Sequence, residues 1–277
     1  MKFGMEKVRH KLCAELHANC AAKDACYLKN AKVGGRYKRA LYKVLSSFGK
    51  VTGHDVSSER KKYSRRCDDR VSLKIFKLKI GKSKPPPLLG KMKERNDKAS
   101  TIIMILESPD VSEYKNASTP GATAEPARGR TGKEIRKHIV EQLMADNDFK
   151  QWRLHLINPV QYSCSLGGLL SSRKKDDLFK SLFNGDIEKC FRNRLVAACG
   201  NRQHVVINCC TNIGRTQINK ILRELGVRFL QMDHPSSWWR HNDIPNCFVN
   251  GSGERKPFSA ELLRTVVVPG GVDVGNV

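Results

Sequence analysis

The stretch STIIMILESPD, residues 100–110, contains five consecutive apolar residues and then changes at once to acidic and polar ones. A short continuous apolar run is typical of a strand that is buried on both faces of a parallel sheet. Three later stretches have the same character: WRLHLINPV at 152–160, QHVVINCC at 203–210 and VRFLQMDHPS at 227–236. The sequence therefore predicts four central strands.

The segments between these runs have helical periodicity. Residues 131–144, 182–199 and 213–226 each place apolar side chains on one face of a helix. Strands that alternate with helices at this spacing indicate an α/β fold. We expect a three-layer α/β/α domain over residues 98–277, with a central, mostly parallel four-stranded sheet.

The start of the chain differs from the rest in its charge. Residues 1–100 carry 27 basic and 9 acidic side chains, whereas residues 101–277 carry 24 and 18, so most of the net charge of +24 lies at the start. Residues 35–49 have the periodicity of a helix. We expect residues 1–97 to form a basic, mainly helical region that contacts nucleic acid, because clustered positive charge binds phosphates.

Composition also indicates the compartment. Ten cysteines, without an apolar leader near the start, favour reduced thiols and a cytoplasmic or otherwise intracellular protein, associated with the nucleoid in a bacterium. No apolar run approaches the roughly 20 residues of a membrane helix, so we expect no membrane partner.

Four of the cysteines lie in the basic region, at Cys13, Cys20, Cys26 and Cys67. Their wide, irregular spacing includes no Cys-x-x-Cys pair, which favours scattered structural thiols over a metal centre. We expect no cofactor, with a metal at these four cysteines as the alternative.

Polar residues follow each predicted strand at the point where it ends. The four loops read LESPDVSEY, NPVQYSCS, CCTNIGR and HPSSWWR. Because active sites of such sheets lie beyond the carboxyl ends of the strands, we expect these loops to converge on one edge.

These loops resemble motifs of the uracil-DNA glycosylase superfamily, closest to its iron–sulfur branch, over residues 100–240. LESPDVSEY followed by PARGRTG resembles the first motif, IN at 157–158 resembles the strand-end asparagine that reads the base, and HPS at 234–236 resembles the second catalytic motif. The matching positions of the first motif are Glu107, Pro109, Glu113, Pro126, Gly129 and Gly132. The Cys-x-x-Cys of that branch is missing here.

The resemblance implies a site that excises a base. His234 would stabilise the negative charge on the departing base, and Asn158 would read its Watson–Crick edge. Glu107, Ser108 and Asp110 are the candidates for orienting the attacking water, and which of them does so stays open. Purely structural roles also stay open: His234 and Asn158 could be turn residues, and Glu107 could cap a helix.

Departures from the family pattern concern the base pocket. Ala127 stands where the family has the phenylalanine that floors the uracil pocket, and Arg128 lies beside it. A missing ring would enlarge the pocket, unless Tyr162 or Tyr114 replaces it. Glu113, with Arg128, is a further candidate for base binding, or a surface residue.

The two tryptophans of HPSSWWR suggest a wedge. Polar flanks indicate that Trp238 and Trp239 are presented to a partner, and the resemblance implies that one of them fills the gap left by a flipped base. We expect one to do this and the other to pack. Ser236 and Arg240 would contact the DNA backbone.

The sequence thus predicts a monofunctional DNA glycosylase that flips a non-standard base from DNA, expected to be double-stranded, and hydrolyses its N-glycosidic bond. A bulky modified cytosine is the favoured base, which would make the role one of defence against phage. The alternatives are a repair enzyme for plain uracil, a DNA-binding module with weak catalysis, and a hydrolase of small nucleosides.

Overall fold

The computed structural model describes residues 67, 69–71, 99–110, 113, 127, 129–164, 172–240, 245–251 and 253–269. The helix expected at residues 35–49, and the remainder of the basic region up to residue 66, lie outside these residues. No helix of the described part is long and apolar enough to cross a membrane.

A single mixed sheet of seven strands forms the centre of the fold, in the order β1-β3-β2-β4-β5-β6-β7. Four neighbouring strands run parallel to one another: β3 (Arg153–Ile157), β2 (Thr101–Ile105), β4 (His204–Asn208) and β5 (Phe229–Met232). Antiparallel strands complete the two edges: β1 (Arg70–Val71) beside β3, and β6 (Asn246–Val249) and β7 (Lys256–Pro257) beyond β5.

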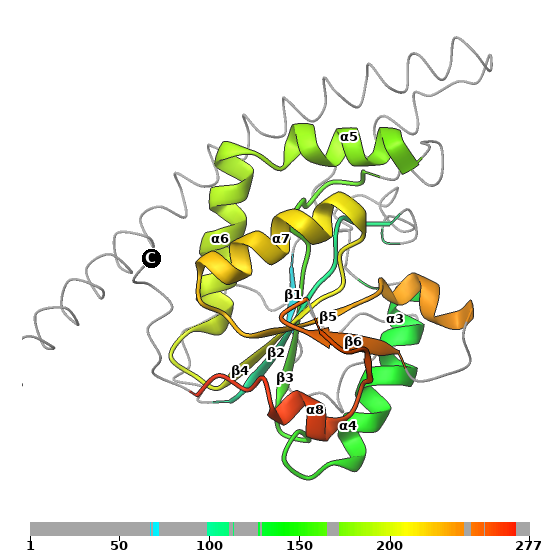
Figure 1. Ribbon diagram of the computed structural model, residues 1–277, viewed down its shortest axis with the longest axis vertical. Helices are drawn as coiled ribbons and strands as arrows, with labels where there is room; N and C mark the ends of the chain where they lie inside the picture. The colour runs from blue at the N-terminus through cyan, green and yellow to red at the C-terminus, as the bar shows by residue number, and fades with distance from the viewer. Residues whose placement is uncertain are drawn as a thin grey trace, which may run out of the picture.

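Helices cover both faces of this sheet (Figure 1). One face carries α5 (Ser172–Leu182), α6 (Gly185–Cys199) and α7 (Asn212–Glu224). The other carries α3 (Arg130–Ile135), the π-helical turn η3 (Arg136–Val140), α4 (Glu141–Ala145) and α8 (Ala260–Arg264). A 3₁₀ helix, η5 (Pro235–Arg240), follows β5 and packs against α3.

Alternation along the strands divides the core in two. Ile103 and Ile105 of β2 belong to the cluster under α5, α6 and α7, whereas Ile102 and Met104 belong to the cluster under α3, α4 and α8. Because successive side chains of a strand point to opposite faces, an all-apolar strand needs a cover on both. This is why the strands read as continuous apolar runs.

The α/β class and the four expected strands are confirmed, and the prediction of a four-stranded sheet is corrected to seven strands. The three added strands are short and lie at the edges, where apolar patterning is weak. Arg70 and Val71, which the sequence placed in the basic region, join the sheet as β1, and Cys67 bonds to the segment after β3. The backbone N–H of Cys67 donates to the Gln161 carbonyl at 2.8 Å, and β1 pairs with β3.

Candidate active site

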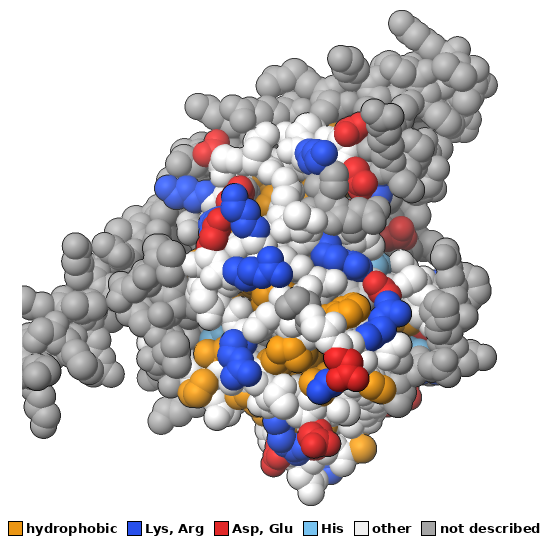
Figure 2. Space-filling model, viewed as in Figure 1, with side chains coloured by type: hydrophobic (Ala, Val, Ile, Leu, Met, Phe, Trp, Pro, Cys, Tyr) orange, Lys and Arg blue, Asp and Glu red, His pale blue; other side chains and the backbone are white. Residues whose placement is uncertain are grey.

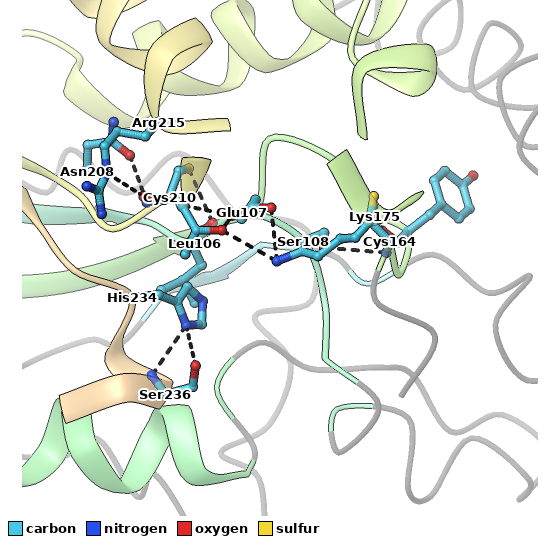
Figure 3. Close-up of polar contacts among 12 residues, drawn as sticks. Leu106, Glu107, Ser108, Cys164, Lys175, Asn208, Cys210, Arg215, His234 and Ser236 are labelled. Carbon is cyan, nitrogen blue, oxygen red and sulfur yellow. Dashed lines mark hydrogen bonds and ion pairs between the residues drawn. The ribbon is translucent and has the colours of Figure 1, made fainter. Parts of the chain in front are cut away.

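The carboxyl ends of the four parallel strands bring the predicted loops together at one edge of the sheet. Glu107 and Ser108 follow β2, Asn158 follows β3, and His234 follows β5. Glu107, Lys175 and Asp110 lie near enough to His234 to influence its titration. Figure 3 shows the part of this edge that contains Glu107, Ser108 and His234.

Ser236 fixes the tautomer of His234. Its backbone N–H lies 3.3 Å from Nδ1 of the imidazole, and its Oγ lies 2.8 Å from the same atom (Figure 3). A backbone N–H can only donate, so Nδ1 accepts and the proton of the neutral ring lies on Nε2. Burial among neighbouring atoms lowers the pKa of His234 to about 4, so the ring is neutral at pH 7. The arrangement therefore offers one N–H donor at Nε2.

The backbone around His234 holds this geometry in place. Its carbonyl accepts hydrogen bonds from the backbone N–H of Ser237 at 2.9 Å and from the Ser237 hydroxyl at 2.7 Å. These contacts close the first turn of η5. The His-Pro turn thus holds the imidazole in a fixed position. His234 can therefore be both a turn residue and a hydrogen-bond donor to the base.

Asn158 is buried with its amide unpaired. Its side chain is 1% exposed, and neither Nδ2 nor Oδ1 has a hydrogen-bond partner among the described residues. Its backbone is nevertheless held, because Nη2 of Arg194 in α6 donates to the carbonyls of Asn158 and Pro159 at 2.9 and 3.3 Å. Asp69 accepts two hydrogen bonds from Nη1 of the same guanidinium. The backbone is anchored while the amide stays open.

Glu107 is occupied by the protein itself. Its Oε2 accepts the backbone N–H of Thr211 at 2.7 Å and also contacts the Thr211 hydroxyl, while Nζ of Lys175 lies 3.1 Å from Oε1. Thr211 is the residue just before α7, so the carboxylate sits at the positive end of that helix. A Cβ on Gly214 would lie 3.0 Å from Cγ of Glu107, which explains a glycine within the first turn. These contacts fit the alternative in which Glu107 caps the start of a helix, here α7.

Ser108 and Asp110 remain as the candidates for orienting water. The Ser108 hydroxyl accepts the backbone N–H of Cys164 at 3.4 Å. Asp110 is exposed, and its carbonyl accepts the backbone N–H of Glu113 at 3.1 Å. Of the three acidic or hydroxyl groups proposed for this role, Asp110 is the most exposed, Ser108 is half-buried and Glu107 is buried.

Glu113 is neither a surface residue nor an ionised one. It is 3% exposed, its Oε1 accepts the backbone N–H of Ala127 at 2.9 Å, and the Cys67 thiol lies 3.6 Å from Oε2. Burial is the main cause that raises the pKa of Glu113 to about 8, with nearby Asp110 adding to the rise. The neutral carboxyl ties the loop after β2 to Ala127, which has a φ of 58°.

The expectation that Ala127 enlarges a base pocket is not supported. Its methyl group is fully buried and packs in the hydrophobic cluster under α3, α4 and α8. Tyr162, one of the rings proposed to replace the missing phenylalanine, is buried in the other cluster, across the sheet. A side chain without exposed surface borders no open pocket, so position 127 gives no evidence on the size of the base.

Trp238 packs and is not presented. It is 4% exposed, its indole N–H donates to the Asp233 carbonyl at 2.9 Å, and its ring meets His138 edge-on with 6.0 Å between centroids. Trp238 is therefore the tryptophan that packs, as expected for one of the two, because an aromatic ring beside α3 gains by burial. The wedge role stays a prediction for Trp239.

Two groups of predicted residues cannot be compared with the structure: those outside the described part, and those whose side chains are not described. Arg128 and Tyr114 fall in the first group, as do Cys13, Cys20 and Cys26, while the side chains of Trp239 and Arg240 fall in the second. Ser236 is exposed and contacts His234 as described above. Within the described ranges, no three His, Cys, Asp or Glu side chains are grouped so that they could hold a metal ion.

Sequence reasoning missed Lys175 and Arg194. Lys175 reaches the site from α5, where its Nζ also lies 3.5 Å from the Thr211 hydroxyl, and Arg194 reaches it from α6. Nothing in their local sequence marks them, because their partners lie 35 to 125 positions away. The glycine at 214, inside a helical pattern, was the one readable sign of a close approach.

No family model, curated protein or solved structure matches the chain.

Proposed function

We propose that the protein is a monofunctional DNA glycosylase that flips a non-standard pyrimidine from DNA and hydrolyses its N-glycosidic bond. The observation that carries the proposal is the pair formed by His234 and Asn158. A neutral imidazole with its proton on Nε2 and a buried, unpaired amide follow two strands of the same parallel set. The resemblance of the three loop motifs to uracil-DNA glycosylases points to the same chemistry.

The spacing of the strands supports a ligand between the two side chains. β2 and β4 separate β3 from β5, so three strand spacings of about 4.8 Å place the strand ends about 14 Å apart. We place the flipped base between these two strand ends, where it would displace the residues that cover the Asn158 amide. Asn158 is then a bidentate partner for the Watson–Crick edge, and His234 approaches a base oxygen.

The reaction breaks the bond between C1′ of the sugar and the ring nitrogen of the base. The electron pair goes to the base, and the N–H of His234 donates a hydrogen bond to the oxygen on which negative charge develops. A water molecule adds its hydroxyl to C1′, and its remaining proton ends on the base. Asp110 is the best placed of the candidates to orient this water and to favour the cationic sugar, because its carboxylate is accessible.

Glu107 takes a positioning role in this proposal. Its contacts with Thr211 and Lys175 join the loop after β2 to α7 and α5. Both oxygens of this carboxylate already contact protein groups, so they are less available to hold a water molecule. We therefore place Glu107 behind the reacting atoms and Asp110 beside them.

A row of cations beside the site supports DNA as the partner. Arg130, Lys133 and Lys137 are exposed at positions i, i+3 and i+7 of the helical segment that packs against η5. Such spacing places them along one side of a helix, where they can follow a phosphate backbone. Elsewhere, basic and acidic side chains are interspersed, as Figure 2 shows for one face.

Base release on defined DNA tests the proposal. The full chain is incubated with duplexes that each contain one uracil, 5-hydroxymethylcytosine or glucosylated hydroxymethylcytosine, and abasic sites are revealed by cleavage in hot alkali. We expect cleavage on at least one duplex with the wild type, and with Lys220→Ala as the control variant, because Lys220 is exposed on α7.

DNA binding without alkali-labile sites on any of these duplexes would overturn the proposal in favour of a binding module. Release from a free nucleoside but not from DNA would favour a small-molecule hydrolase.

A further inference from the structure

Two asparagines, at the ends of the strands on either side of β2, differ in how their amides are held. Asn208 ends β4, and its Oδ1 accepts the backbone N–H of Cys210 at 3.0 Å, while its Nδ2 donates to Oδ1 of Asn219 at 2.7 Å. Because a backbone N–H only donates, these bonds fix which end of the Asn208 amide carries oxygen. Asn158, after β3, has no such bond to either amide atom among the described residues.

An unpaired amide inside a protein is costly. A buried donor or acceptor without a partner costs about 1–3 kcal/mol, and Asn158 has one of each. Residues that close over the amide leave it 1% exposed, so a base reaches it only when they move aside. A ligand with an adjacent donor and acceptor would satisfy both atoms at once.

Because no hydrogen bond from a described residue fixes the Asn158 amide, the amide can turn over, and this affects which base edges it can bind. Rotation of an amide by 180° exchanges its oxygen and nitrogen with little change of shape. A 4-oxo pyrimidine such as uracil presents a donor at N3 and an acceptor at O4. A 4-amino pyrimidine such as cytosine presents an acceptor at N3 and a donor at its amino group. One orientation of the Asn158 amide matches the first edge, and the other orientation matches the second.

We infer that the site binds 4-oxo and 4-amino pyrimidines alike through an amide that turns to suit the base. This inference rests on the proposed function. An asparagine locked as Asn208 is would instead reject one edge, because hydrogen-bonding sites reject mismatched analogues by about 10⁴- to 10⁵-fold.

A site that accepts both edges must reject ordinary cytosine and thymine by another feature. The C5 substituent is the remaining difference among pyrimidine bases. The inference therefore assigns substrate choice to C5, which is consistent with a modified pyrimidine as the substrate, whether it derives from cytosine or from uracil.

Affinity measurements on DNA that cannot be hydrolysed test base recognition by itself, because the different leaving-group abilities of the two bases do not affect them. DNA duplexes carry 5-hydroxymethyluracil or 5-hydroxymethylcytosine as the 2′-fluoroarabino nucleotide, which resists hydrolysis, opposite an abasic analogue so that neither base has a pairing partner. A duplex with abasic analogues on both strands is the reference. Kd is measured for the wild-type full chain, for Asn158→Leu, and for Asn193→Leu, whose asparagine is exposed on α6.

The wild type should bind both base-containing duplexes more tightly than the reference, with Kd values within tenfold of each other. Asn158→Leu should weaken binding of both by about 10- to 100-fold, the magnitude of a bidentate base contact, and Asn193→Leu should change neither. If Asn158→Leu does not fold, Asn158→Ala removes the same amide and takes its place.

Loss of affinity for only one of the two bases would overturn the inference while leaving the proposed glycosylase intact. Binding no tighter than the reference for either base would instead remove the flipped-base site and, with it, the proposed function.

Discussion

The carboxyl edge of the sheet contains two kinds of polar side chain. One kind is closed: Asn208, Asn219 and Gln231 form a chain of amide hydrogen bonds, and Glu107 is bound by Thr211 and Lys175. The other kind is open: the amide of Asn158 has no partner among the described residues, and Nε2 of His234 carries a proton that no described residue accepts.

This difference distinguishes polar groups that stabilise the fold from polar groups that are available to a ligand, although the two kinds lie close together. Closed groups satisfy one another and so contribute to folding, whereas an open group lowers stability and is explained by a ligand that satisfies it. Changes to open groups should therefore alter activity and leave stability intact, and changes to closed groups should do the reverse. Each prediction below can break this division.

The largest effect is expected at His234. His234→Ala should reduce base release about 10²- to 10³-fold, the loss that follows removal of one donor to a developing anion, without lowering the free energy of unfolding. Single-turnover rates and urea unfolding measure the two quantities. Since the pKa of His234 is about 4, the wild-type rate should show no titration of this residue between pH 6 and 8. A rate within threefold of the wild type would show that His234 takes no part in base release.

A pH-dependent effect on stability is expected at Glu113, a closed group. Its pKa is raised from 4.5 to about 8 by folding, so the unfolded chain loses its proton first and stability falls as the pH rises through that window. Because the slope nears its full value of about 1.4 kcal/mol per pH unit only well above pH 4.5, the wild type should lose about 2–3 kcal/mol relative to Glu113→Gln between pH 5 and pH 7. Urea unfolding of both proteins at each pH measures the difference. Parallel pH profiles would show that Glu113 is ionised in the folded protein.

A smaller loss of stability is expected within the amide chain. Gln231→Leu removes the acceptor that Nδ2 of Asn219 reaches at 2.6 Å, and it leaves that donor buried and unpaired. The free energy of unfolding should fall by about 1–3 kcal/mol, while base release per folded molecule stays unchanged. Gln142→Leu on α4, which is half-buried, is the matched control. Selective loss of base release in a stable Gln231→Leu would mean that the closed chain also serves the chemistry.

The smallest effect concerns the cations on the helical segment before α4. Lys133→Ala and Lys137→Ala should each reduce the slope of log K against log salt by about 0.9 for every phosphate that the variant no longer neutralises, with the same base preference. Lys220→Ala, 77% exposed on α7, should leave the slope unchanged. Titrations of duplex DNA from low to moderate salt measure it, and equal slopes for all three variants would place the DNA elsewhere.

The sequence predicted the parallel centre of the sheet well, because a strand covered on both faces needs apolar residues at nearly every position and so forms a recognisable apolar run. It predicted the edges poorly: β6 is short and partly exposed, β7 is short and exposed, and β1 lies in a basic stretch. The pairing of β1 depends on contacts with β3, more than 80 positions away, and no local pattern reports such a contact.

For the candidate site, position after a strand could be predicted, but the state of each side chain could not. The sequence placed Glu107, Asn158 and His234 at one edge as the structure does, yet it left open whether each side chain binds the protein itself or a ligand. Thr211 and Lys175 occupy Glu107, and their approach depends on how α5 and α7 pack. Trp238 likewise lies inside because α3 covers it, which its polar neighbours in sequence did not reveal.

The bond between Arg194 and Asp69 affects how the protein can be shortened. A fragment that began at residue 98, where composition suggests a boundary, would lose Asp69 and leave the guanidinium that grips the Asn158 and Pro159 carbonyls without its carboxylate. It would also lose Cys67, which bonds the Gln161 backbone. A minimal fragment therefore has to begin ahead of residue 67. Otherwise, an expression boundary chosen for convenience would loosen the backbone that carries the base-reading amide.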